Sequence, residues 1–227
     1  MAKPERKTAR LKTDWTWDEV RSLAQERGLT LIGVDEAGRG PLCGPVAAGA
    51  VALLAEPWPE GLACSKTLKP QQRERLYEQI TQDEHAWAVA ESSVEEIDRL
   101  NILQASLLAM HKAVDTLMAK LGLQKESVLV AVDGNRLPAW PYPSVAVVKG
   151  DAKIPAVSAA SIVAKVHRDR WCKAQATLYP QYGIEVHMGY PTPLHLEMLA
   201  RHGASPIHRR SFGPVRQALA TQQGDLW

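Results

Sequence analysis

The sequence has few cysteines and almost no net charge. Its three cysteines, Cys43, Cys64 and Cys172, are odd in number and show no CxxC spacing. This argues against a disulfide framework and a zinc ribbon, and it favours a reducing compartment. The formal net charge is +2, so a surface that binds nucleic acid has to be a local patch. The histidines show no HExxH spacing, which excludes that zinc-hydrolase signature.

Long hydrophobic runs are missing as well. The longest, from Val46 to Ala55, is well short of the ~20 residues that a helix needs to span a bilayer. The basic N-terminus is not followed by the apolar stretch of a secretory signal peptide. With 45% apolar and 23% charged residues, the composition is that of a globular protein. We therefore expect a soluble, cytoplasmic protein without membrane contact.

Strands and helices are predicted to alternate along the chain. Short β-branched runs predict strands near residues 31–35, 46–54, 86–91, 128–133 and 145–148. Apolar periodicity and capping signals predict helices after Thr16 and Ser93 and over residues 69–81, 102–121, 156–173, 194–201 and 213–221, with a loop over 179–193. This order is typical of an α/β protein with a mixed sheet covered by helices.

Acidic side chains follow three of the predicted strands. Asp35, Asp133 and Asp151 each come just after an apolar run, and Glu36 adjoins the first. Ligands of open α/β sheets bind just outside strand ends. Like charges ~4 Å apart repel by ~4 kcal/mol at an effective dielectric constant near 20, so carboxylates gathered there take up protons or bind hard cations. Oxygen ligands select Mg²⁺ or Mn²⁺ over zinc, which predicts a metal-dependent phosphoryl-transfer enzyme.

The first acidic pair poses a geometric question. Side chains alternate along a strand, so Asp35 and Glu36 reach one metal only if the strand ends there. The glycine-rich segment from Ala37 to Pro41 is expected to end it. Its spacing is not that of a dinucleotide-binding fingerprint. Turn formation is the alternative role for a single aspartate, above all for Asp133 in its Asp-Gly dipeptide.

The segment Gly33–Pro41, with the sequence GVDEAGRGP, resembles the signature of the prokaryotic type 2 ribonucleases H, the ribonuclease HII family. Five further segments match the family in the same order: Asn101–Ala105, Val132–Asn135, Lys149–Pro155, Ser158–Val166 and His208–Phe212. The resemblance extends from about residue 30 to residue 218.

The resemblance implies an RNase H-like mixed five-stranded sheet flanked by helices, with a helical C-terminal part. Residues 1–28 would be a basic extension, residues 29–175 the catalytic core, and residues 176–227 the helical part beside the substrate groove. The implied activity is hydrolysis of the RNA strand of RNA–DNA hybrids and cutting on the 5′ side of single ribonucleotides embedded in duplex DNA. The products would carry a 3′-hydroxyl and a 5′-phosphate, and the enzyme is expected to be a monomer.

Family motifs also imply roles for individual residues. Four carboxylates would be catalytic and would hold two Mg²⁺ or Mn²⁺ ions: Asp35, Glu36, Asp133 and Asp151. Gly38, Arg39 and Gly40 would sense the ribose 2′-hydroxyl, Tyr190 would stack at the RNA–DNA junction, and Lys66 would contact a phosphate. The chain departs from the family at Cys64, where aspartate is common, and at Met188, where lysine is.

The helix predicted over residues 156–173 carries two stripes. Four of its residues are expected to be buried: Ala159, Ile162, Val163 and Val166. The second stripe is polar, and a solvated face is its simplest explanation: Ser158, Ser161, Lys165, Arg168 and Asp169. Because this helix begins beside Asp151, where the positive end of the helix dipole favours phosphate, we expect Ser161 and Lys165 to touch the substrate backbone. His187 and His208 are expected at the surface without a catalytic task.

Two alternatives remain open at this point. One is a catalytically inactive relative that only binds hybrid duplexes, although such a binder would gain affinity by losing the four carboxylates. The other is a DNA nuclease or integrase with an RNase H fold. Cleavage of a duplex that carries one ribonucleotide, but not of an all-DNA duplex, distinguishes all three.

Overall fold

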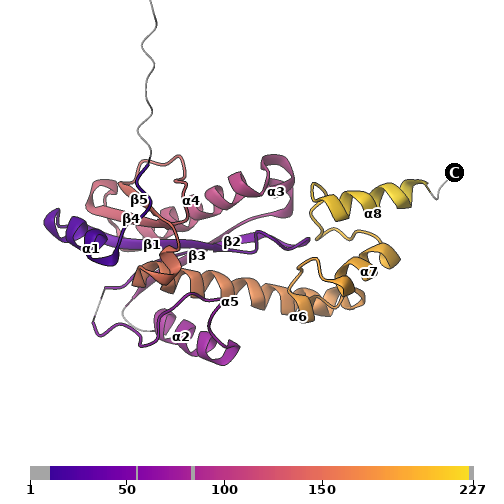
Figure 1. Cartoon of the computed structure of the whole chain (residues 1–227), viewed down its shortest axis with the longest axis horizontal. Coiled ribbons are helices and arrows are strands. Elements are labelled where there is room, and N and C mark those ends of the chain that lie inside the picture. Colours follow the sequence, from indigo (N-terminus) through magenta and orange to yellow (C-terminus); the bar gives the residue numbers. More distant parts are fainter. Residues whose placement is uncertain (1–10, 55, 83–84, 225–227) are drawn as a thin grey trace, which may run out of the picture.

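The computed structural model describes residues 11–54, 56–82 and 85–224. At its centre lies a five-stranded sheet with the strand order β3-β2-β1-β4-β5 (Figure 1). The strands are β1 (Thr30–Ala37), β2 (Val46–Ala52), β3 (Ala86–Ser92), β4 (Val128–Asp133) and β5 (Ser144–Val147). β1 pairs antiparallel with β2 and parallel with β4. The predicted mixed five-stranded sheet is therefore confirmed.

Helices cover both faces of this sheet. The α-helices are α1 (Trp17–Glu26), α2 (Pro70–Gln82), α3 (Val94–Leu100), α4 (Ile102–Leu121), α5 (Pro155–Leu178), α6 (Ile184–His187), α7 (Pro193–His202) and α8 (Gly213–Gly224). Short 3₁₀ turns are η1 (Lys125–Ser127), η2 (Gly150–Ala152) and η3 (Pro180–Tyr182). In Figure 1, α3 and α4 lie on one face and α2 and α5 on the other, while α6, α7 and α8 lie beyond one end of the sheet.

Local sequence signals account for several helix ends. Thr16 and Ser93 each form a capping box with the glutamate three residues later, as predicted. α4 ends at Gly122, whose φ of 63° lies in the left-handed region. The buried face predicted for α5 is also confirmed, because Ala159, Ile162 and Val163 are fully buried.

Two glycines let α5 approach the sheet closely. A Cβ atom on Gly33 of β1 would lie 2.1 Å from the backbone of Ala156, and one on Gly49 of β2 would lie 2.5 Å from the carbonyl oxygen of Ala160. No larger side chain fits at either position. This contact places the first turns of α5 against the part of β1 that carries Asp35.

Some predicted boundaries are wrong. α5 continues to Leu178 instead of ending at Lys173, because no glycine or proline interrupts it before Pro180. The segment 179–193 is not a plain loop, since it contains η3 and α6. The division into three parts stays a prediction, and residues 1–10 of the N-terminal extension lie outside the described residues.

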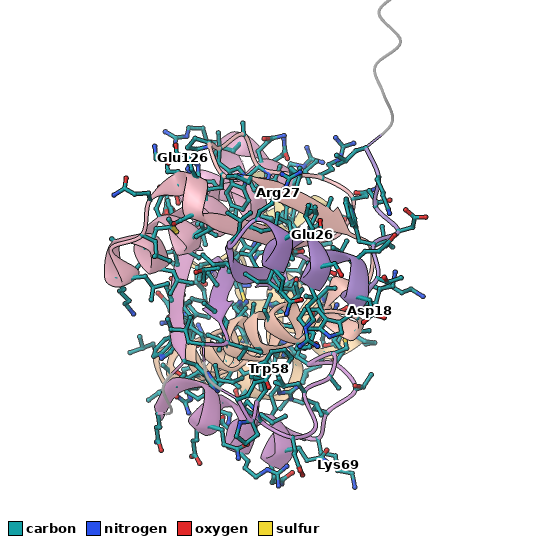
Figure 2. All side chains as sticks on the ribbon, turned by 90° about the vertical axis from the view of Figure 1, so that its left-hand side faces the viewer. Asp18, Glu26, Arg27, Trp58, Lys69 and Glu126 are labelled. Carbon is teal, nitrogen blue, oxygen red and sulfur yellow. The ribbon has the colours of Figure 1, made fainter. Side chains whose placement is uncertain are left out.

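α1 lies across the end of the molecule opposite to α7 and α8. Figure 2 looks onto this end and shows α1 with Trp58 beneath it. The rings of Trp17 and Trp58 meet edge to face, with their centroids 5.5 Å apart. Among the described residues, no helix combines the length and the apolar character that crossing a bilayer requires.

Candidate active site

Asp35 and Asp133 lie side by side on neighbouring strands. The parallel register of β1 and β4 pairs Gly33 with Ala131 and Val34 with Val132, so the next residues are the two aspartates. Adjacent strands are ~4.8 Å apart, and paired residues face the same side of a sheet. Both carboxylates therefore point to the face that α5 covers. At an effective dielectric constant of 20, two charges ~5 Å apart repel by about 3 kcal/mol.

Asp151 is brought to this pair by a turn. The chain leaves β5 through Lys149, which has a left-handed φ of 58°, and enters η2. The backbone N–H groups of Gly150 and Asp151 donate to Oδ1 of Asp133, at 2.7 and 3.4 Å. Asp151 thus follows the strand end, as predicted, but it is held by a turn that folds back onto β4.

Glu36 is the second-last residue of β1. β1 ends at Ala37, which pairs with Ala47 of β2, so the strand ends where the glycine-rich segment begins, as predicted. Alternation along the strand turns the Glu36 side chain away from the face of Asp35, but at the end of the strand it borders cavities on both sides of the sheet edge. There it forms an ion pair with Arg39, at 3.2 Å, and it lines a cavity of about 170 Å³ together with Asp133.

The electrostatics confirm that the acidic groups interact. Burial, followed by the charges of Glu36 and Asp133, raises the pKa of the Asp35 carboxyl well above its usual range. Burial and then the Asp151 carboxylate raise the pKa of Asp133. Burial lowers the pKa of Lys66, but nearby acidic groups, Asp35 first, outweigh it and raise this pKa. Burial and mutual repulsion therefore make the charged forms of Asp35 and Asp133 costly without a cation beside them.

The donor set fits a hard divalent cation, because it offers carboxylate oxygens. Within the described residues, however, no three or more His, Cys, Asp or Glu side chains converge tightly enough to hold a metal ion. Some of the carboxylate oxygens accept hydrogen bonds from the backbone instead: the N–H of Glu36 donates to Oδ1 of Asp35 at 2.7 Å. The four-carboxylate ligand set stays a prediction.

A cavity of about 370 Å³ adjoins the acidic cluster and brings the expected substrate-binding residues together. Glu36 lies on its wall, next to the glycine-rich loop that follows β1. All seven residues predicted to bind substrate line it: Gly38, Arg39, Gly40, Lys66, Ser161, Lys165 and Tyr190. They come from four segments far apart in the sequence.

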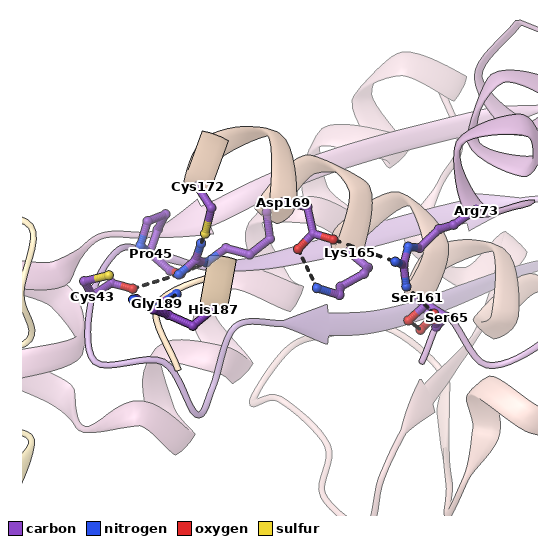
Figure 3. A network of polar contacts seen from close by, with 11 residues as sticks. Cys43, Pro45, Ser65, Arg73, Ser161, Lys165, Asp169, Cys172, His187 and Gly189 are labelled. Atoms are coloured by element: carbon purple, nitrogen blue, oxygen red, sulfur yellow. Dashed lines mark hydrogen bonds and ion pairs between the residues drawn. The ribbon is translucent and has the colours of Figure 1, made fainter. Parts of the chain in front are cut away.

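The polar stripe of α5 lies inside this region and not on a solvated face. Figure 3 shows the Ser161 hydroxyl beside that of Ser65, with their oxygens 2.8 Å apart, and Lys165 paired with Asp169. Ser161 is only 4% exposed. Arg73 of α2 approaches the same Asp169 to 4.0 Å. Explaining this stripe as a solvated face is therefore wrong.

Comparisons with known proteins identify the family of the chain. The ribonuclease HII family model matches residues 32–215. The chain belongs to the ribonuclease HII family. It is 56% identical over 189 residues to ribonuclease HII of Ralstonia nicotianae, covering 83% of this chain and 79% of that protein. It is 57% identical to ribonuclease HII 2 of Methylibium petroleiphilum, covering 83% and 84%.

Solved structures show the same fold. Ribonuclease H2 from Pyrococcus horikoshii has a TM-score of 0.68 at 28% identity, covering 86% of this chain and 99% of that one. A Bst-RNase HIII in complex with Mn²⁺ has a TM-score of 0.69 at 17% identity, covering 88% and 73%. With family membership established, the chain is an enzyme, a ribonuclease H that hydrolyses RNA paired with DNA.

Two buried arginines bind the backbone of the glycine-rich loop, a role that was not predicted from the sequence. Arg168, assigned to the polar stripe, is 2% exposed and donates to the carbonyl oxygens of Pro45 and Cys43, at 3.1 and 2.7 Å. Arg209 binds the same loop. Arg209 lies in His208–Phe212, a segment that resembles the ribonuclease HII family. The resemblance indicates that this segment matters, but no sequence signal indicates that the glycine-rich loop is the partner of Arg209.

Buried histidines hold the backbone of Tyr190, so the surface location expected for His187 and His208 is wrong. The N–H of Ser205 donates to Nδ1 of His208 at 3.1 Å, which leaves the proton of neutral His208 on Nε2, facing Nε2 of His195 at 3.2 Å. His195 then carries its own proton on Nδ1, 3.0 Å from the carbonyl oxygen of Tyr190. This relay requires neutral rings, and burial lowers the pKa of both His195 and His208.

Proposed function

We propose that this ribonuclease H cuts on the 5′ side of single ribonucleotides embedded in duplex DNA, as well as within RNA–DNA hybrids, and leaves a 3′-hydroxyl and a 5′-phosphate. The observation that carries the proposal is the pairing of Asp35 with Asp133 beside a cavity lined by a glycine-rich loop, two lysines and a tyrosine. One chain supplies every one of these residues, so we propose that a monomer is active.

Asp35, Glu36, Asp133 and Asp151 would hold divalent cations in the substrate complex, and we propose two ions, Mg²⁺ or Mn²⁺. Their chemistry when bound is to lower the pKa of an attacking water and to neutralise charge on the scissile phosphate and the departing oxygen. The burial and the mutual repulsion that raise the pKa of Asp35 and Asp133 support this assignment, because a bound cation would relieve both. So does the lack of a softer ligand among the four residues.

The glycine-rich loop is suited to sensing a ribose 2′-hydroxyl. Only the 2′-hydroxyl separates ribose from deoxyribose at a given position, and bare backbone approaches a sugar more closely than side chains allow. Tyr190 is 43% exposed, and its Cε1 would lie 3.1 Å from a Cβ added to Gly40. The sensing loop and the proposed stacking ring therefore adjoin, as recognition of one ribonucleotide at an RNA–DNA junction requires.

Lys66, Ser161 and Lys165 would contact the phosphate backbone. Lys165 pairs with Asp169 on the cavity wall, so a phosphate has to compete for an ammonium group that is already in place. We expect Lys165→Ala to weaken affinity for the duplex by about tenfold, roughly one phosphate contact. Lys173→Ala, which removes an exposed lysine of the same helix, is the matched control, and unchanged affinity and turnover in Lys165→Ala would contradict the assignment.

The deciding experiment uses three duplexes of one sequence: all-DNA, DNA with one ribonucleotide, and an RNA–DNA hybrid. We expect a cut 5′ of the single ribonucleotide, cuts in the hybrid, and none in all-DNA. Cleavage of all-DNA would indicate the DNA nuclease alternative. Binding without cleavage would indicate the inactive binder.

A further inference from the structure

One buried guanidinium collects the carbonyl groups of the glycine-rich loop. Arg209 is fully buried. Its nitrogens donate to five carbonyl oxygens at 2.6 to 3.1 Å, those of Gly38, Arg39, Pro41, Gly44 and Pro45. All five lie within eight residues of chain, so Arg209, together with Arg168 at Cys43 and Pro45, fixes the course of the loop. Bonds from a charged donor are roughly twice as strong as neutral ones.

These contacts also set the direction of the N–H groups. In a trans peptide the C=O of one residue and the N–H of the next point to opposite sides. Because the carbonyls of Gly38 and Arg39 turn inward to Arg209, the N–H groups of Arg39 and Gly40 turn outward. Both residues are exposed on the cavity wall. Within the ranges that the structure describes, neither N–H group has a hydrogen-bond acceptor.

Arg209 is itself held in place. Its N–H donates to the carbonyl oxygen of Leu42 at 2.8 Å, next to a short antiparallel bridge between Cys43 and His208. Beyond it, the Asp98 carboxylate of α3 accepts from the N–H groups of Arg210 and Ser211, both at 2.9 Å. The guanidinium therefore has little freedom to follow the loop if the loop moves.

Its charge has no carboxylate partner among these contacts. Burial, and then the nearby charge of Arg168, lower the pKa of Arg209 to about 9, so the group stays charged at neutral pH. A buried charge is expensive unless hydrogen bonds compensate it. A buried Arg209 whose only partners are carbonyl oxygens is therefore explained if the enzyme needs the glycine-rich loop in this one conformation.

We propose that Arg209 is a positioning residue for ribose recognition: it turns the carbonyls of the glycine-rich loop inward and so presents the N–H groups of Arg39 and Gly40 to the nucleotide beside the cut. This inference rests on the proposed function of the loop. It assigns specificity to a side chain that does not line the cavity.

The consequence for kinetics is specific. Affinity for a duplex comes mostly from phosphate contacts, which Arg209 does not make. Misplacement of a binding group by about 1 Å costs about 100-fold in rate. Arg209→Ala should therefore lower kcat on the single-ribonucleotide duplex by about 10- to 100-fold and leave KM within about twofold, since the phosphate contacts persist.

The test adds chemical rescue. Millimolar guanidinium should restore kcat of Arg209→Ala by filling the vacated space, whereas sodium at equal ionic strength should not. Arg210→Ala is the matched control, because Arg210 is the exposed neighbour. Arg209→Lys covers the case in which the alanine variant does not fold. An ammonium group has three donors and cannot span five carbonyls, so kcat should fall at unchanged KM.

The outcomes are distinguishable. The inference is overturned if Arg209→Lys has the kcat of the wild type, or if folded Arg209→Ala loses activity that guanidinium does not restore. In both cases the proposed function still holds, because the wild-type enzyme cuts the single-ribonucleotide duplex. If the wild-type enzyme cuts hybrids but not the single-ribonucleotide duplex, the proposed function fails and the inference fails with it.

Discussion

Replacing Gly38 by alanine tests the packing of the sensing loop most sharply. Gly38 has a φ of +96°, and a Cβ there would lie 2.9 Å from Nε of the buried Arg168. A side chain at such a φ costs about 1–2 kcal/mol. Overpacking against a fixed neighbour costs typically about 1–3 kcal/mol more. We therefore expect Gly38→Ala to lower the free energy of unfolding by about 2–5 kcal/mol.

The chain offers a matched control for the backbone part of this cost. Gly61 has a φ of +87°, but a Cβ there meets nothing within 4 Å. Gly61→Ala should cost only the backbone strain, about 1–2 kcal/mol. Urea unfolding of both variants measures the difference, which we expect to exceed about 1 kcal/mol. Equal destabilisation would refute the view that Arg168 braces the loop at Gly38. Gly38→Ala should also cut hybrids more slowly, whereas Gly61→Ala should not.

Three further predictions concern the surroundings of the loop. Gly40→Ala places its Cβ 3.1 Å from the exposed ring of Tyr190, so turnover on the single-ribonucleotide duplex should fall while the urea midpoint stays within error. Burial lowers the pKa of His208 from 6.5 to about 4. Above pH 6.5 His208 is neutral in both the folded and the unfolded chain, so its burial does not affect stability. Between pH 6.5 and 4 only the unfolded chain takes up a proton at His208. The free energy of unfolding should then fall by up to about 3 kcal/mol, and His208→Gln should flatten that part of the pH profile. Asp98→Ala removes the acceptor of the N–H groups of Arg210 and Ser211, and because both residues are exposed to water, thermal denaturation should show a loss of about 0.5–1.5 kcal/mol.

Local patterns predicted the elements well. Thr16 and Ser93 cap their helices as expected, because a capping box involves residues only three apart. The strand that ends in Asp133 was also predictable, since its five preceding residues are apolar. The end of α5 was predicted too early, at Lys173, although the first helix-breaking residue is Pro180 and the helix extends to Leu178.

Contacts between residues far apart in the chain could not be predicted from the sequence. Arg209 binds carbonyls more than 160 residues away, and no periodicity records which backbone a buried arginine will meet. The histidines were expected at the surface because a single histidine carries no burial signal. The end of β1 at Ala37 was predictable from the glycine-rich segment that follows, but that Glu36 borders cavities on both sides of the sheet edge was not.

The central claim is that Asp35 and Asp133 act together in metal-dependent cleavage of the RNA strand. The most direct measurement compares wild type with Asp133→Asn on the single-ribonucleotide duplex, with and without Mg²⁺, under single-turnover conditions. Loss of several kcal/mol of charge stabilisation predicts that Asp133→Asn is slower by at least about 100-fold at saturating Mg²⁺, and that wild type is inactive without it. An asparagine variant that cuts at the wild-type rate would contradict the account.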